Sequence, residues 1–197
     1  MDIPASLVKQ LRERTNAGLM DCKAALKESD GDLDKAVEYL RIKGLAAAQK
    51  KSERATSEGM VTSYVHPGNR IGVLVEISCE TDFVARTDEF QNFGRDIAMQ
   101  IAATAPLAVE RADIAADVVE KERELFRTQA LEEKKPEKVV EKIVDGRIEK
   151  FYTENCLLDQ AFIKDDSKSV SDLLNELISK LGENIKIARF SRFQIGQ

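Results

Sequence analysis

Few side chains in this sequence could carry out acid–base, nucleophilic or metal chemistry, and they are scattered. Glu80 and Asp82 are neighbouring carboxylates, and such a pair can in principle exchange protons with a substrate. In a chain with 35 acidic residues, their proximity is weak evidence for a catalytic pair. His66 is the single histidine, which removes most catalytic triads and metal sites. We expect His66 to be solvated or to stabilise a turn.

The cysteines and glycines form no recognisable catalytic or nucleotide-binding motif. Cys22, Cys79 and Cys156 are isolated and odd in number, which is typical of packing residues in a reducing compartment. The sequence has no glycine-rich phosphate loop ending in Lys-Ser or Lys-Thr, and no Gly-x-Gly-x-x-Gly fingerprint. It therefore predicts a binding or regulatory protein, with no enzymatic chemistry, metal or cofactor.

The most distinctive chemistry lies where an apolar run ends and an amphipathic helix begins, within residues 76–86. There an acid, Asp82, directly precedes an aromatic residue, Phe83. A corner between a strand and a helix can hold such a pair rigidly and present it at a surface. In the alternative interpretation, Thr81 or Asp82 caps the helix and Phe83 packs inward.

Hydrophobic periodicity predicts the elements that position this corner. A β-hairpin of residues 60–65 and 70–77 precedes it, and a last strand is expected at 184–195. Helices are expected at residues 5–14, 19–28, 33–43 and 88–104, from residue 115 or 117 to 131, from the turn at 134–137 to about 155, and at 169–181. Gly44 is expected to end the third helix.

This order predicts an α+β protein with three parts. Residues 1–45 form a three-helix bundle, 46–57 a locally basic linker, and 58–197 a core domain. Because the predicted strands fall at the two ends of the core, we expect a small antiparallel sheet of about three strands with helices covering one face.

Composition favours an ordinary soluble protein. Hydrophobic residues make up 43% of the 197 residues and charged residues 33%, as in globular proteins. A net charge of -5 argues against general nucleic-acid binding, which leaves a basic footprint. We recognise no signal peptide, and no apolar run approaches the roughly 18 residues of a membrane span. A cytoplasmic protein is expected, with no membrane and no direct nucleic-acid contact.

Two stretches carry a resemblance to a known family. Residues 11–26 read Leu-Arg-Glu-Arg-Thr-Asn-Ala-Gly-Leu-Met-Asp-Cys-Lys-Ala-Ala-Leu, and residues 81–86 read Thr-Asp-Phe-Val-Ala-Arg. Both resemble translation elongation factor Ts of bacteria and organelles, the guanine-nucleotide exchange factor for elongation factor Tu. The resemblance covers the whole chain in order. It departs at Asn16, where the family usually has Gly, and at Leu19, where it usually has Met.

The resemblance implies a short member with one core subdomain, lacking the inserted helical coiled coil and C-terminal helix of longer members. It also implies that the N-terminal bundle resembles the ubiquitin-associated fold and docks on the G domain of the Tu factor. The matching positions are Arg12, Leu19, Met20 and Lys23, with charge at the rim and apolar side chains as an anchor. Because adjacent helical residues point in different directions, one of Leu19 and Met20 is expected inside the bundle.

For the corner, the resemblance implies that Asp82 and Phe83 push between helices of the G domain, near the bound magnesium and phosphates. Phe83 would act as a wedge and Asp82 as its polar partner. Thr81 and Val84 are expected to cap and pack the corner, and Arg86 to orient it by pairing with a nearby acid. Binding to the nucleotide-free form of the partner would then be preferred.

Alternatives stay open for function and assembly. The chain could be a non-catalytic adaptor that binds a helical or ubiquitin-like partner through the bundle, or whose residues 46–57 touch RNA. A short member could also form a homodimer through the core sheet, with the final strand at the interface. We expect the protein to be located in the bacterial cytoplasm, or in an organelle matrix or stroma if it is organellar.

Overall fold

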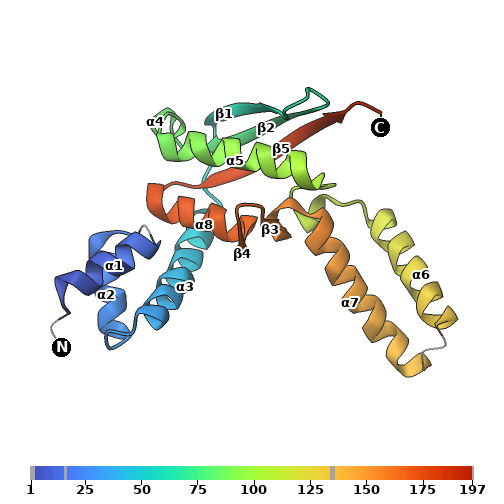
Figure 1. Ribbon diagram of the computed structural model, residues 1–197, viewed down its shortest axis with the longest axis horizontal. Helices are drawn as coiled ribbons and strands as arrows, with labels where there is room; N and C mark the ends of the chain where they lie inside the picture. Colours follow the sequence, from blue (N-terminus) through green and yellow to red (C-terminus); the bar gives the residue numbers. More distant parts are fainter. Residues whose placement is uncertain (1–2, 16, 134–135, 197) are drawn as a thin grey trace. The chain divides into compact units, whose positions relative to one another are not determined.

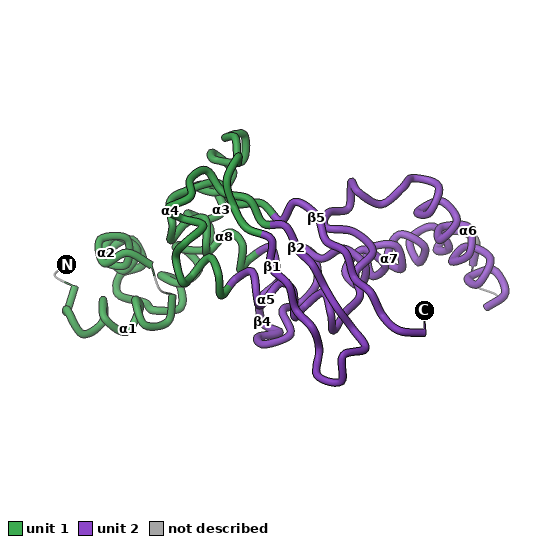
Figure 2. The backbone as a smooth tube through the Cα atoms, turned by 90° about the horizontal axis from the view of Figure 1, so that it is seen from above, with its two compact units in different colours: residues 1–60, 77–92, 172–186 green, residues 61–76, 93–171, 187–197 purple. Residues whose placement is uncertain are grey.

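A computed structural model of the chain describes residues 3–15, 17–133 and 136–196. Asn16, which departs from the family pattern, lies outside these described residues. The chain divides into two compact units, coloured green and purple in Figure 2. Unit 1 comprises residues 1–60, 77–92 and 172–186, and unit 2 comprises residues 61–76, 93–171 and 187–197.

The described elements confirm the predicted α+β class (Figure 1). The helices are α1 (Ala5–Thr15), α2 (Leu19–Glu28), α3 (Leu33–Lys51), α4 (Asp82–Ala85), α5 (Asp88–Thr104), α6 (Ala116–Glu132), α7 (Glu137–Asn155) and α8 (Val170–Leu181). The strands are β1 (Glu58–Val65), β2 (Ile71–Cys79), β3 (Ala161–Phe162), β4 (Asp165–Ser169) and β5 (Ile185–Gln194). Short 3-10 turns occur at Arg111–Asp113 and Leu157–Asp159.

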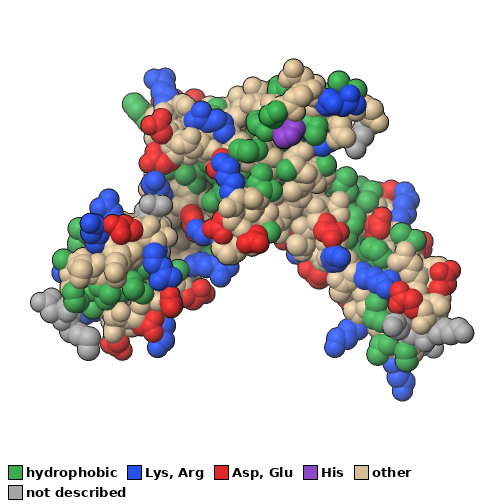
Figure 3. All heavy atoms as spheres, viewed as in Figure 1, with side chains coloured by type: hydrophobic (Ala, Val, Ile, Leu, Met, Phe, Trp, Pro, Cys, Tyr) green, Lys and Arg blue, Asp and Glu red, His purple; other side chains and the backbone are tan. Residues whose placement is uncertain are grey.

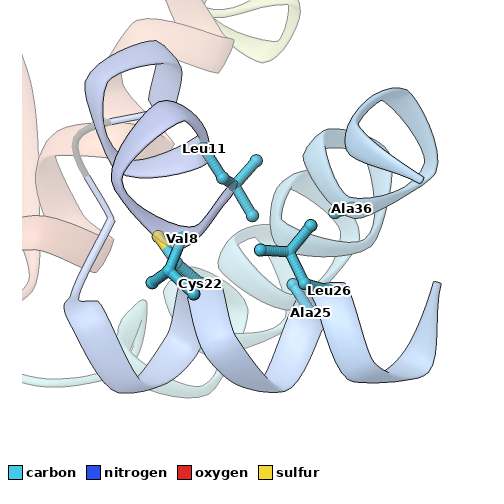
Figure 4. Close-up of a cluster of buried hydrophobic side chains, with 6 residues drawn as sticks. All are labelled: Val8, Leu11, Cys22, Ala25, Leu26 and Ala36. Carbon is cyan, nitrogen blue, oxygen red and sulfur yellow. The ribbon is translucent and has the colours of Figure 1, made fainter. Parts of the chain in front are cut away.

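The first three helices pack around an apolar cluster in unit 1. Figure 4 shows its buried members, which are Val8, Leu11, Cys22, Ala25, Leu26 and Ala36. Asp32 begins α3 as its N-cap, because its carboxylate accepts hydrogen bonds from the backbone N–H groups of Asp34 and Lys35. These bonds, that of Lys35 above all, hold the pKa of Asp32 below its ordinary value.

The predicted end of the third helix at Gly44 is wrong, because α3 continues to Lys51. Contacts with α8 accompany this extension within unit 1. The guanidinium of Arg41 pairs with Asp172 at 3.2 Å, and Nζ of Lys51 donates to the carbonyl of Ile178 at 3.4 Å. A Cβ built on Gly44 would lie 3.8 Å from the side chain of Ser179, so the glycine faces α8. Tertiary contacts thus outweigh the low helix propensity of glycine here.

Three antiparallel strands form the main sheet in the order β1-β2-β5, as expected. The turn between β1 and β2 places Gly68 and Asn69 at positive φ, at 93° and 55°. On β2 the alternate residues Val73, Val75 and Ile77 are all buried. Helix α5 covers one face of the sheet in unit 2, where the guanidinium of Arg192 on β5 donates to the α5 carbonyl of Ala102 at 3.2 Å.

Helices α6 and α7, both predicted from the sequence, pair as an antiparallel hairpin (Figure 1). The hairpin has its own buried cluster, formed by Ala130, Val140, Val144 and Ile148. Arg127 pairs with Glu141 at 2.9 Å across the two helices. Leu125 on α6 is exposed.

Strands β3 and β4 form a second, two-stranded sheet in a segment where the sequence predicted no strand. Ser169 is the last residue of β4, and α8 begins at the next residue, Val170. Gln100 and Gln160 lie buried beside this sheet, and Nε2 of Gln100 donates to Oε1 of Gln160 at 3.1 Å. Oε1 of Gln100 accepts from the backbone N–H of Ile163 at 2.9 Å, so the buried amide is satisfied.

Candidate functional site

The corner between β2 and α5 is a single turn of helix, α4, with Thr81 as its N-cap. The hydroxyl of Thr81 accepts from the backbone N–H of Val84 at 3.4 Å, and the Val84 side chain is buried. The sequence Thr-Asp-Phe-Val folds this way because an extended threonine can satisfy a free N–H of the first turn. Capping at Thr81 and packing at Val84 fix the backbone on either side of Asp82 and Phe83.

Phe83 does not pack inward, since 78% of its surface is exposed. The preceding carboxylate, Asp82, pairs with the guanidinium of Arg86 one helical turn later, at 2.8 Å. This pair is itself largely exposed, so it orients the two side chains more than it stabilises the fold. The corner therefore presents an aromatic ring beside an oriented carboxylate.

Sequence reasoning missed the residues that hold the corner's backbone. The carboxylate of Glu183, just after α8, accepts hydrogen bonds from the backbone N–H groups of Glu80 and Thr81, at 3.1 and 3.0 Å. Its other oxygen accepts from the Thr81 hydroxyl at 2.7 Å. The only sequence signal was the turn Gly182-Glu183-Asn184 after α8, which by itself predicts no contact with residue 81.

Close backbone packing fixes the strand that leads into the corner. Gly59 has a φ of 147°, and a Cβ there would lie 2.7 Å from the Cα of Ser78 and closer still to the carbonyl oxygen of Ile77. At the end of β2, the thiol of Cys79 donates to the carbonyl of Thr81 at 3.1 Å. Burial, with a smaller contribution from the negative charge of Glu183, raises the pKa of the Cys79 thiol. Cys79 is therefore a packing residue.

A second exposed apolar surface lies on α2. Leu19 and Met20 are 56% and 75% exposed, so the expectation that one of them lies inside the bundle is wrong. Cys22, Ala25 and Leu26 fill the core side of α2 instead.

Lys23 lies one turn after Leu19 and Met20 on α2, and its side chain is exposed. Arg12 is exposed on α1, which packs against α2. The predicted docking residues and the corner all belong to unit 1.

The described residues hold no group of three His, Cys, Asp or Glu side chains placed to bind a metal ion. All three cysteines are free and buried, as expected of packing residues. Within the described part of the chain, no helix is both long and apolar enough to span a bilayer. On the face that Figure 3 shows, acidic and basic side chains are interspersed over the surface.

An exposed aromatic ring on a fixed corner and an exposed apolar helix surface are features of a protein that binds another protein. Comparison with known sequences agrees, since residues 32–197 match the family Elongation factor TS. The chain belongs to this family of translation elongation factors.

Curated relatives extend the match over nearly the whole chain. Elongation factor Ts of Carboxydothermus hydrogenoformans is 62% identical over 99% of this chain and 90% of its own length. The protein of the same name from Thermoanaerobacter sp. (strain X514) is 61% identical over 99% of this chain and 96% of its own. Elongation factor Ts of Desulfosudis oleivorans is 55% identical over 99% of this chain and 98% of its own length. The matches thus cover nearly all of this chain and at least 90% of each of these relatives.

Proposed function

We propose that this protein is a guanine-nucleotide exchange factor that binds elongation factor Tu and promotes the release of GDP, in the bacterial cytoplasm. The observation that carries the proposal is Phe83, an aromatic side chain 78% exposed on a capped and hydrogen-bonded turn. Exposing a large aromatic ring to water is unfavourable for the isolated protein, so a partner that buries it gains binding free energy. Family membership makes elongation factor Tu that partner.

The corner's geometry suits a wedge that disturbs the magnesium and phosphate site of the partner. Phe83 would enter between helices of the G domain, and Asp82 beside it would contact the displaced elements. Since the Asp82 carboxylate already pairs with Arg86, it enters the interface with a cation attached. This pairing lowers the cost of bringing a negative charge into a partly desolvated contact. No covalent chemistry is needed at any step.

The energetics require the factor to prefer the nucleotide-free partner. If the wedge weakens nucleotide binding, then nucleotide must weaken binding of the factor by the same ratio. Each tenfold change in nucleotide affinity takes about 1.4 kcal/mol of differential contact. A buried aromatic ring can supply roughly one to two such steps.

The exposed surface of α2 would hold the partner while the wedge acts. Leu19 and Met20 offer an apolar anchor, and Lys23 and Arg12 offer positive charge at its edge. Helix α3 connects the N-terminal bundle to α8 through the contacts of Arg41 and Lys51. Docking on α2 would thereby restrain where the corner meets the G domain.

Release of labelled GDP from elongation factor Tu tests the proposal directly. Wild-type protein should accelerate release, and Phe83→Ala should lose most of the acceleration while its unfolding curve stays unchanged. Leu125→Ala is a matched control, because Leu125 is also an exposed apolar side chain but lies on α6. Failure of micromolar wild-type protein to accelerate release would refute exchange and leave the adaptor alternative.

We also propose that two chains pair through the open face of the main sheet. Strands β1 and β5 are the edges of this sheet. Leu74 points away from the buried side chains of Val73 and Val75, and Phe193 points away from its neighbour Arg192, which contacts α5. The exposed apolar residues of the strands are Val61, Val65, Leu74 and Phe193, and Ile195 lies in the turn just after β5. Several of them line a shallow hollow together with Arg70 and Ile71. A second copy would bury this patch, which is unusual for a surface that stays in water.

A further inference from the structure

We infer that Glu183 is a positioning residue for nucleotide exchange, acting on the partner through Phe83 without touching it. This inference rests on the exchange function proposed above. One carboxylate binds three consecutive donors of the corner: the N–H groups of Glu80 and Thr81 and the hydroxyl of Thr81. Phe83 follows these donors by two residues, so their position fixes where its ring emerges.

A reciprocal contact closes the arrangement into a ring. The carboxylate of Glu80 accepts from the backbone N–H of Asn184 at 2.6 Å, while Glu183 accepts from the backbone of Glu80. The side-chain amide of Asn184, only 2% exposed, donates to the carbonyls of Ser52 and Arg54 at 3.2 and 2.8 Å. Three segments of unit 1 are thereby joined: the end of α3, the corner, and the connection from α8 to β5.

Glu183 also determines how the Thr81 hydroxyl caps α4. A hydroxyl has one proton to donate and lone pairs with which to accept. Because Thr81 donates its proton to Glu183, its oxygen is free to accept from the N–H of Val84. Without Glu183, that hydroxyl could turn to another acceptor and the cap would weaken. The carboxylate therefore orders the cap as well as the backbone.

Helix α4 needs such external support because it is only four residues long. A single helical turn is unstable alone, since it fixes several backbone dihedrals for very few hydrogen bonds. The position of Phe83 is therefore set by the partners of residues 80 and 81 more than by the helix itself. Because Phe83 is already held rigidly in the free protein, little conformational entropy is lost when its ring enters the partner. More of the binding free energy can then act against nucleotide binding.

A purely structural role for Glu183 makes a different prediction from a positioning role. If Glu183 only stabilised the fold, its loss would act independently of Phe83, and the effects of the two substitutions on exchange would multiply. If Glu183 acts through Phe83, its loss matters only while the phenyl ring is present. A double-mutant cycle separates these cases, since residues that work as one unit are non-additive.

The experiment measures GDP release from elongation factor Tu with full-length wild type, Glu183→Ala, Phe83→Ala and the double variant, at equal concentrations of folded protein. We expect Glu183→Ala to lose about tenfold or more of the acceleration, as a misplaced reacting group does. In the Phe83→Ala background, the same substitution should change the rate less than about twofold. Glu132→Ala, which removes an exposed glutamate on α6, should match wild type.

Glu183→Gln provides a second, milder variant. Its amide keeps one accepting oxygen but turns the other position into a donor, so an intermediate loss is expected with the same dependence on Phe83. Equal activity of Glu183→Ala and wild type, or multiplying effects, would overturn the positioning role. So would failure of both Glu183 variants to fold, which would make Glu183 a folding residue. A wild-type protein without activity would instead refute the exchange function itself.

Discussion

Met20 and Leu26 lie on the same short helix, one exposed and the other buried. Substituting each residue should therefore separate an effect on partner binding from an effect on the stability of the fold. Met20 is 75% exposed and Leu26 is fully buried in the bundle. We expect Met20→Ala to leave the free energy of unfolding within about 0.5 kcal/mol of wild type, yet to weaken binding to elongation factor Tu about tenfold. Leu26→Ala should lower the free energy of unfolding by about 2–5 kcal/mol.

Urea unfolding and a binding titration with elongation factor Tu measure these two effects separately. An unchanged dissociation constant for Met20→Ala would remove α2 from the proposed docking surface. A lower free energy of unfolding for Met20→Ala would show that the Met20 side chain packs against the protein in solution.

Cys156 gives the protein a predicted sensitivity to alkaline pH. Burial, with a smaller effect of the negative charge on Asp159, raises the pKa of this thiol to about 11 from the ordinary 9.0. The unfolded chain releases this proton first as the pH rises, so the free energy of unfolding should fall between about pH 9 and pH 11. The expected loss from this group is on the order of 2 kcal/mol.

Unfolding measured from pH 8 to pH 11 on wild type and Cys156→Ala tests this prediction. Lysines and tyrosines also titrate in this range, so the difference between the two proteins isolates the thiol. If both curves fall in parallel, the prediction fails.

At the scale of elements, two glycines should respond to alanine in opposite directions. Gly59 in β1 has a φ of 147° and lies against the backbone of Ile77 and Ser78, so Gly59→Ala is expected to lower the free energy of unfolding by about 2 kcal/mol or more. Gly146 lies within α7 with open space where a Cβ would be. Gly146→Ala should therefore raise the free energy of unfolding by about 0.5–1 kcal/mol.

Denaturant unfolding of the two variants side by side checks both signs at once. Because Gly59 packs against the strand that enters the corner, its variant should also slow GDP release. A stable, fully active Gly59→Ala protein would show that the corner does not depend on this close backbone packing.

Elements with strong periodicity could be predicted from the sequence, including α2 and α5 with the bounds that the structure shows. The exceptions have tertiary causes. Gly44 signals a helix end, but contacts of Arg41 and Lys51 with α8 keep α3 helical beyond it. The charged run at 165–169 forms a strand because it pairs with β3. Local patterns do not contain such long-range partners.

The same limit applies to the candidate site. Residues 81–86 are contiguous, so their pattern was visible in the sequence. Glu183 is separated from Thr81 by 102 residues, and only the fold brings its carboxylate to the corner. Leu19 and Met20 look like core residues by type, and their exposure is visible only once Cys22, Ala25 and Leu26 are seen to fill the bundle.

At the scale of the whole molecule, the proposed exchange surfaces belong to unit 1 and the open sheet face to unit 2. Assembly can therefore be altered without substituting any residue of the corner. Phe193 is the most exposed of the apolar residues on that face, at 68%. In a symmetric pair, each substitution occurs on both sides of the interface, so its effect is doubled. Phe193→Glu would place two negative charges in one apolar contact.

At micromolar concentration, we expect light scattering to give wild-type protein the mass of a dimer, about twice that of one chain. Phe193→Glu should have the mass of a monomer. Stability of the folded chain should change little, because Phe193 is exposed within one chain. Leu131→Glu is the control, since Leu131 is an exposed apolar residue on α6 and should leave the mass unchanged. A monomeric wild type at high concentration, or a dimer that survives Phe193→Glu, would rule out pairing through this face. The second result would direct attention to other exposed apolar side chains, such as Leu125 and Leu131 on α6.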